Sequence, residues 1–397
     1  MHPRSMSGAK RRALILLVPM LPLAAQVKLP PGSREEARAA STYQNLRKAP
    51  SPDPLRCEVH RFPPRLSYGL RYWAGYQVDL ALKSAAGARR WAILVRVQPE
   101  GGEPVYLFQR RTIPTAAEGV RPPANAQYSA GGGFFLGMGR YQVEWFLVDD
   151  KGRYCRSSWS VKTPGSKLSL QQAPLTVDSP FREGWKGLNA EDGPGARLTL
   201  LLNAAPFLRR RHQVKLSAYE RGVLLDSLTS FLDRSGASEA RVVVFDLERR
   251  RILAEEDRFD PRGFRRLAEK MMEAEYGTIP YQVLLSGGSE FDMIDSLLAR
   301  ETGRDGGGRA IVFLGPMGGM AGRRPRPDPA ITARPAGIYY LALTNPQASP
   351  GDAIQKTVRQ WGGKTFAVYG PADLAKAADA LRPLVRLAEL PRPHSDR

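Results

Sequence analysis

Leu198-Thr199-Leu200-Leu201-Leu202-Asn203 is the stretch of sequence that decides the fold of the C-terminal half. A short, continuous apolar run of this kind is typical of a strand that is buried on both faces of a sheet. Ser217, with Glu220 three residues later, follows the run as a capping box and predicts the start of a helix. A buried strand that leads into a helix predicts a parallel sheet covered by helices.

The same alternation continues along the rest of the chain. Further buried strands are predicted at residues 242–245, 311–314, 338–343 and 365–369, with a hairpin return at residues 251–254. Helices are expected to begin near Asp260, Ser289, Ser349 and Pro371, and Pro383 should kink or end the last one. Residues 196–390 are therefore predicted to form an α/β domain with a doubly wound, mostly parallel sheet, followed by a tail at residues 391–397.

Upstream of this domain, the apolar residues alternate with a period of two. Segments with this pattern lie at residues 76–82, 91–97, 141–147 and 155–161, and turn-forming residues separate them. The alternation predicts an all-β sandwich of immunoglobulin-like outline over residues 56–163. Residues 164–195, which are rich in proline and glycine, are interpreted as the linker between the two domains.

The N-terminus has the order of a secretory signal peptide. Lys10, Arg11 and Arg12 precede an apolar run at residues 13–23, and Ala24-Ala25 follow as small residues before a cleavage site. We therefore interpret residues 1–25 as a signal peptide and expect export to the periplasm or the extracellular space, with no transmembrane segment after cleavage. Residues 26–55, with their prolines, are interpreted as a flexible segment before the sandwich.

Composition and charge restrict the class of protein. The chain has 397 residues, 42% of them apolar, which excludes a wholly disordered chain and a polytopic membrane protein. Its 59 Lys and Arg against 39 Asp and Glu give a formal net charge of +20. A basic excess can indicate nucleic-acid binding, but these bases are spread along a chain expected to be exported, so nucleic acid is not expected as a partner.

Two cysteines flank the predicted sandwich. Cys57 lies just before its first strand and Cys155 in its last, in a chain expected to reach an oxidising compartment. This placement predicts a structural disulfide. The alternative, two buried thiols that never meet, stays open because sequence spacing does not fix the geometry of a bridge.

The order of elements over residues 197–390 resembles a von Willebrand factor type A (VWA) domain, and in particular the VWA-related domains of secreted acidobacterial proteins. In that family an Asp-x-Ser-x-Ser loop after the first strand supplies oxygen ligands to Mg²⁺. Here Asn203, Ala205 and Phe207 occupy the corresponding positions, and Gly315-Pro316-Met317 stands where a later aspartate is expected. The resemblance therefore implies the fold with a degenerate metal loop, and no metal or other cofactor is expected.

Catalytic motifs are missing from the sequence. The four histidines are scattered, and none forms a zinc motif or a nucleophile triad with neighbouring residues. The sequence thus offers no catalytic residue, and we expect a protein that is not an enzyme. The alternative is a cell-envelope hydrolase whose carboxylates are dispersed along the chain.

Two arginine-rich loops are predicted at the carboxyl ends of the parallel strands, where ligands of open sheets bind. They contain the candidate partner-binding residues Arg209, Arg210, Arg211, Arg323, Arg324 and Arg326. Arginine beside large apolar residues favours an interface, so we expect an exported adhesion-type protein that binds a protein partner. Two other interpretations remain open: a module for an anionic glycan or lipid, and two merely solvated basic loops.

Overall fold

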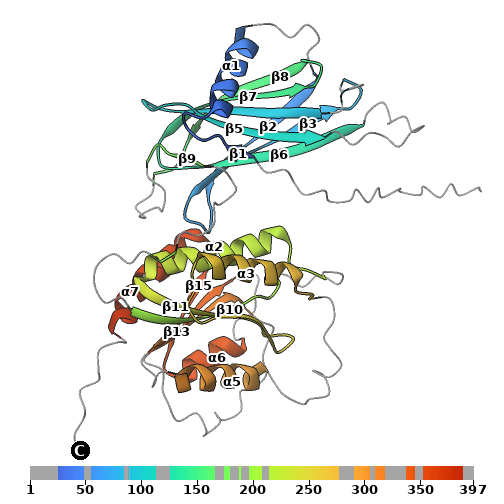
Figure 1. Ribbon diagram of the computed structural model, residues 1–397. Coiled ribbons are helices and arrows are strands. Elements are labelled where there is room, and N and C mark those ends of the chain that lie inside the picture. The colour runs from blue at the N-terminus through green and yellow to red at the C-terminus, as the bar shows by residue number, and fades with distance from the viewer. Residues whose placement is uncertain are drawn as a thin grey trace, which may run out of the picture.

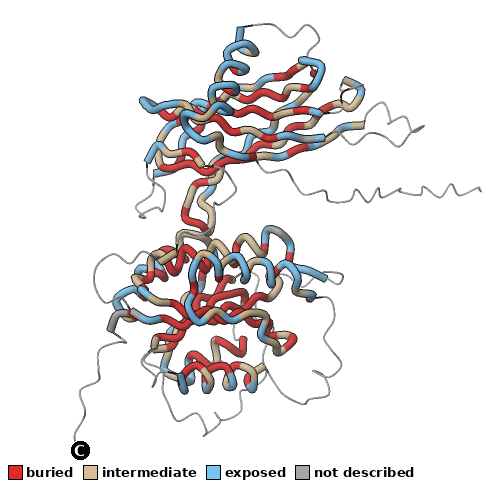
Figure 2. The backbone as a smooth tube through the Cα atoms, viewed as in Figure 1, coloured by how far each residue is buried: buried red, intermediate tan, exposed pale blue. Residues whose placement is uncertain are grey.

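The computed structural model describes residues 26–48, 55–84, 88, 90–112, 126–165, 174–178, 187–188, 196–207, 214–276, 290–304, 309–317, 337–344 and 352–387. Within these residues the chain forms three sheets and six helices (Figure 1). Buried positions follow the interiors of the sheets, and the outer turns of the helices are exposed (Figure 2). None of the helices in these ranges is long and apolar enough to span a bilayer.

Sheet A has five strands in the order β1-β5-β4-β7-β8, and all neighbouring strands are antiparallel. Its strands are β1 (Val27–Lys28), β4 (Arg90–Pro99), β5 (Val105–Thr112), β7 (Arg140–Asp149) and β8 (Tyr154–Lys162). Sheet B has four strands in the order β2-β3-β6-β9, also antiparallel. Its strands are β2 (Cys57–Leu66), β3 (Tyr72–Ala81), β6 (Gln127–Leu136) and β9 (Val177–Asp178), the last within the segment interpreted as a linker.

The inner faces of sheets A and B pack against each other. Their shared core contains Tyr76 and Val78 from β3, and Val95 and Trp145 from sheet A. The rings of Tyr76 and Trp145 meet edge to face with centroids 5.8 Å apart. This agrees with a β-rich region of immunoglobulin-like outline, built by alternating inward residues.

A disulfide joins the two sheets. Cys57 in β2 bonds to Cys155 in β8, with the Cα atoms 6.4 Å apart. The predicted disulfide is confirmed. It closes a long loop of chain that contains most of the strands of both sheets.

The outer face of sheet A is covered by helix α1 (Arg34–Lys48) (Figure 1). Tyr43 of α1 is only 1% exposed and packs between the rings of Tyr106 and Phe146. Its hydroxyl also donates a hydrogen bond to Glu144. Residues 26–48, interpreted from sequence as flexible, therefore form an edge strand and a docked helix.

Sheet C has six strands in the order β12-β11-β10-β13-β14-β15, parallel except for β12. Its strands are β10 (Ala196–Asn203), β11 (Ala237–Asp246), β12 (Arg251–Glu256), β13 (Ala310–Pro316), β14 (Gly337–Leu343) and β15 (Lys364–Val368). One face packs against α2 (Ala218–Ser235), α3 (Pro261–Glu273) and α7 (Pro371–Leu387). The other packs against α5 (Glu290–Gly303) and α6 (Ala353–Gln360).

Several local predictions for this half are confirmed. Ser217 and Glu220 form the capping box of α2, and Asp260 caps α3 ahead of Pro261. Pro383 lies inside α7, which continues to Leu387, so the expectation that this proline ends the helix is wrong.

The predicted fold class is nevertheless wrong. Fifteen strands in three sheets against six helices make the described part of the chain mostly β, so a doubly wound α/β fold of VWA type does not describe it. The prediction gave most weight to the alternation of strands and helices after residue 196. Nine of the strands come before that point.

The hairpin formed by β2 and β3 extends from sheet B to the helices that cover sheet C (Figure 1). Tyr68 in its turn packs against the core that α2 and α7 share with sheet C. Leu70 is fully buried and adopts a φ of 52°. The turn is closed by hydrogen bonds between Ser67 and its neighbours Leu70 and Arg71. One hairpin therefore belongs to both halves of the molecule.

Candidate functional site

The carboxyl ends of the parallel strands of sheet C form one edge, here called the carboxyl edge. In open parallel sheets this edge is the usual place for a ligand. Asn203 ends β10, Asp246 ends β11 and Pro316 ends β13. Outside the described residues lie the candidate partner-binding arginines Arg209, Arg210, Arg211, Arg323, Arg324 and Arg326.

Asn203, the first residue of the degenerate metal loop, has a structural role. It is fully buried, its Nδ2 donates to the carbonyl of Pro316 at 3.2 Å, and its Oδ1 accepts from the amide of Leu247 at 3.4 Å. The side chain thereby ties β10 to the ends of β13 and β11. An ionised aspartate could not donate to a carbonyl, which explains why an amide suits this position.

Gly315 allows β13 to approach this asparagine closely. Its φ of 146° lies in a region open mainly to glycine, and a Cβ atom there would come within 2.5 Å of the Asn203 carbonyl oxygen. The close approach of the two strands therefore requires glycine at this position.

Glu220 fixes the other end of the degenerate loop. Its carboxylate accepts from the Ser217 amide at 2.8 Å and from the Phe207 amide at 3.1 Å. Phe207 itself packs partly buried against the core, and Ala205 is half-buried before it. The structure thus brings Asn203, Ala205 and Phe207 into a loop braced by hydrogen bonds. Among the described residues, no three His, Cys, Asp or Glu side chains are grouped as metal ligands.

Two buried aspartates at this edge were missed by the sequence reasoning. Asp246 is fully buried; burial raises the pKa of its carboxyl, against the opposing effect of Arg249 and Arg251. Asp352 caps α6 by accepting from the Gln355 amide at 2.6 Å, and the Tyr340 hydroxyl lies 3.0 Å from its other oxygen. Aspartate directly after an apolar strand or before a helix was the available signal. Both carboxylates bond to groups that hold the loops in place.

Three tyrosines, called the tyrosine group below, gather beside the carboxyl edge: Tyr68, Tyr219 and Tyr369. Tyr219 in the first turn of α2 is 74% exposed, and Tyr369 after β15 is 60% exposed. Burial raises the pKa of Tyr68 to about 12, with further contributions from nearby Tyr219 and Asp373. Asp373 in turn accepts from the Tyr369 amide at 3.2 Å. Sequence patterns did not reveal this group because it combines the β2–β3 turn with two helix starts.

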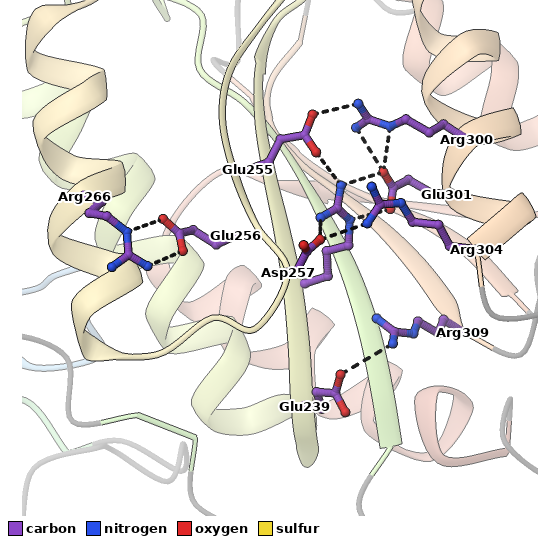
Figure 3. A network of polar contacts seen from close by, with 10 residues as sticks. Glu239, Glu255, Glu256, Asp257, Arg266, Arg300, Glu301, Arg304 and Arg309 are labelled. Atoms are coloured by element: carbon purple, nitrogen blue, oxygen red, sulfur yellow. Dashed lines mark hydrogen bonds and ion pairs between the residues drawn. The ribbon is translucent and has the colours of Figure 1, made fainter.

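A charged cluster lies on β11, β12 and the end of α5, away from the carboxyl edge of sheet C (Figure 3). Arg241 of β11 is 2% exposed, and its guanidinium binds Glu301 of α5 at 2.7 Å, as well as Glu255 and Asp257. The hydrogen bonds of these carboxylates raise the pKa of Arg241 despite its burial. Arg300 and Arg304 complete the cluster by pairing with Glu255 and Asp257. Each charge has a partner, so the cluster joins β11, β12 and α5 as a structural unit.

Comparisons with known proteins do not assign a family. No family model matches the chain. No curated protein matches it. A solved structural genomics target is 17% identical, covering 32% of this chain and 97% of its own, with a TM-score of 0.17.

Two further solved structures are similarly distant. A putative ApaA protein from Bordetella pertussis is 11% identical, covering 29% of this chain and 98% of its own, with a TM-score of 0.16. A β-glucuronidase from Bacteroides uniformis is 11% identical, covering 79% of this chain and 39% of its own, with a TM-score of 0.20. None of these likenesses indicates a VWA domain, and scores this low carry no argument about function.

Proposed function

We propose that this chain is an exported, non-enzymatic binding protein of adhesion type, whose protein partner docks at the carboxyl edge beside the tyrosine group. The observation that carries the proposal is the exposure of Tyr219 and Tyr369 around the partly buried Tyr68. Tyrosine is enriched where one protein binds another, because it offers a large rigid surface with a polar end.

The polar groups of this edge support a binding role. Glu220, Asp246 and Asp352 are buried, and the bonds described above engage them in caps and loop braces. Such groups preorganise a surface, which reduces the entropic cost of association. The arginines of the adjoining loops, named above, remain part of the proposed surface as a sequence prediction. The disulfide between Cys57 and Cys155 supports export to an oxidising compartment.

Site-specific photo-crosslinking tests the proposal. A photoreactive phenylalanine analogue replaces Tyr219 or Tyr369 in the full-length chain, expressed in its native host. The matched control position is Met272, which is 48% exposed on α3. We expect one envelope protein to be crosslinked from positions 219 and 369 and not from 272, and its capture to be lost in an Arg210→Glu background. Equal products from all three positions, or none, would contradict the proposal.

A further inference from the structure

The outer face of sheet B carries a flat aromatic surface. The indole of Trp73 lies across Gly75 of its own strand and Gly133 of β6, because a Cβ atom at these glycines would come within 2.0 Å and 2.7 Å of the ring. Only glycine leaves room for a ring in this position. Phe62 of β2 stacks beside it, with centroids 6.4 Å apart and planes 19° from parallel, and is 42% exposed.

A polar group lies further along the same face. Residues 73, 75, 77 and 79 of β3 alternate with inward residues, so Asp79 and Trp73 share the outer face. Asp79 accepts from Ser129 of β6 and from Gln77 at 3.1 Å, and its other oxygen lies 3.0 Å from Nε2 of His60 on β2. Donors on three strands therefore hold the carboxylate in one orientation.

Between the aromatic residues and the polar group, Gly131 leaves the outer face of sheet B without a side chain. Gly131 pairs with Gln77 and is exposed, and a Cβ atom there would meet only the Tyr76 carbonyl oxygen at 3.6 Å. The combined strip, called the sheet B strip, consists of Phe62 and Trp73, then Gly131, then Asp79 and His60. In the described part of the chain α1 covers sheet A, and Figure 1 places it on the far side of the sandwich from this strip.

The polar end does not have the geometry of a hydrolytic triad. Ser129 donates to Asp79 rather than to His60, so the imidazole is not placed to take a proton from the serine hydroxyl. The hydrogen bonds instead present Asp79 as a fixed acceptor at the edge of an aromatic surface. That combination favours binding over catalysis.

We propose that the sheet B strip binds a neutral glycan. A pyranose ring has an apolar C–H face, which would pack on the indole of Trp73 and the ring of Phe62, and a rim of hydroxyls, which would donate to Asp79 and accept from Gln77. Apolar contact together with a few fixed polar groups is the usual composition of a small-molecule site. Glu58 and Asp79 on this face are acidic, whereas the exposed Arg65, which pairs with Trp73 across β2 and β3, is basic. Charges of both signs favour a neutral sugar over a polymer that carries charge of one sign.

Calorimetric titration of the full chain tests this proposal, with cellohexaose and mannohexaose as neutral probes and hexagalacturonate as the anionic one. We expect saturable binding of a neutral hexasaccharide, weakened about tenfold by Trp73→Ala, because one aromatic stacking partner is lost. Gly75→Ala should weaken it similarly, since the added methyl displaces the indole. Asp79→Asn should also weaken it about tenfold, through the loss of charge-assisted hydrogen bonds.

Met272→Ala is the control, because it removes an exposed apolar side chain of α3, outside both the sheet B strip and the tyrosine group. Glycan affinity should stay within about twofold in this variant, and crosslinking from position 219 should persist in Trp73→Ala. The two proposals can thus fail separately. Circular dichroism and thermal unfolding verify that each variant is folded. Failure of both neutral probes to bind, tighter binding of hexagalacturonate, or unchanged affinity in folded Trp73→Ala would each overturn the glycan proposal.

Discussion

The outer faces of sheets A and B both carry aromatic residues, yet they differ in what lies over them. On sheet A, Tyr106 and Phe146 contact Tyr43 of α1 and are buried. On sheet B, Trp73 lies on glycines of β3 and β6, and Phe62 beside it stays 42% exposed. An outward aromatic residue among bulky neighbours thus forms packing surface for a helix. An outward aromatic residue over glycines lies flat on the sheet and stays half-buried instead of fully covered.

The largest expected effect concerns the disulfide that joins sheets A and B. Replacing both Cys57 and Cys155 by serine should lower the free energy of unfolding by about 4 kcal/mol, because the bridge spans a sequence separation of 98 residues. Guanidinium unfolding of the oxidised protein and of the double variant measures the difference. A loss below about 1 kcal/mol would mean that the sheets are held together mainly by their core.

The covered face gives the next largest effect. Tyr43→Ala should lower the free energy of unfolding by about 3 kcal/mol, since a buried ring between Tyr106 and Phe146 is removed. Tyr43→Phe, which loses only the bond to Glu144, should cost about 1 kcal/mol. Denaturant titration of the three proteins tests the prediction. Equal stability of wild type and Tyr43→Ala would show that α1 is not docked in solution.

The open face should tolerate truncation. Phe62→Ala is expected to change the free energy of unfolding by no more than about 1 kcal/mol, because Phe62 is already substantially solvated. The same unfolding experiment applies, with Tyr43→Ala as the reference. A cost similar to that of Tyr43→Ala would mean that another part of the molecule covers Phe62, and the contrast between the faces would disappear.

The smallest effect is a pH dependence at the polar end of the sheet B strip. Hydrogen bonds from Ser129 and Gln77, followed by the His60 contact, lower the pKa of Asp79 below its ordinary value of 3.8. A carboxyl whose folded pKa is lowered stabilises the fold above its unfolded pKa, and this contribution is lost as the pH falls through the folded value.

Thermal unfolding of wild type and Asp79→Asn between pH 7 and pH 2.5 measures this contribution. Wild type should lose slightly more stability over the acid end of that range, because the amide does not titrate. Parallel curves would indicate that Asp79 is solvated rather than held by its donors.

The sequence predicted most elements of sheet C because each carries a local signal, such as the apolar run ending at Asn203 or the capping box at Ser217. It assigned residues 26–55 to a flexible segment and so missed the docking of α1, because the few apolar side chains of this helix find their partners only on sheet A. The predicted fold class was wrong because the alternation of strands and helices in one half does not show how much of the whole chain is in sheets.

The candidate sites were harder to predict than the elements. The bonds of Asn203 arise from strands far apart in sequence, so no spacing rule could supply them. The position of Trp73 likewise depends on the register that sets Gly133 opposite Gly75. Cross-strand register is a tertiary property, and the local period of apolar residues along one strand does not fix it.

The β2–β3 hairpin has a thermodynamic consequence. Tyr68 stands in its turn beside the carboxyl edge, and Trp73 lies on the strand that leaves this turn. A glycan that shifts Trp73 would therefore change the position of the turn that holds Tyr68. A protein partner that binds around Tyr68 would in turn change the position of Trp73, on which the sugar packs. By linkage the two effects must be equal in free energy, so any change in partner affinity caused by the glycan would reappear as the same factor in glycan affinity.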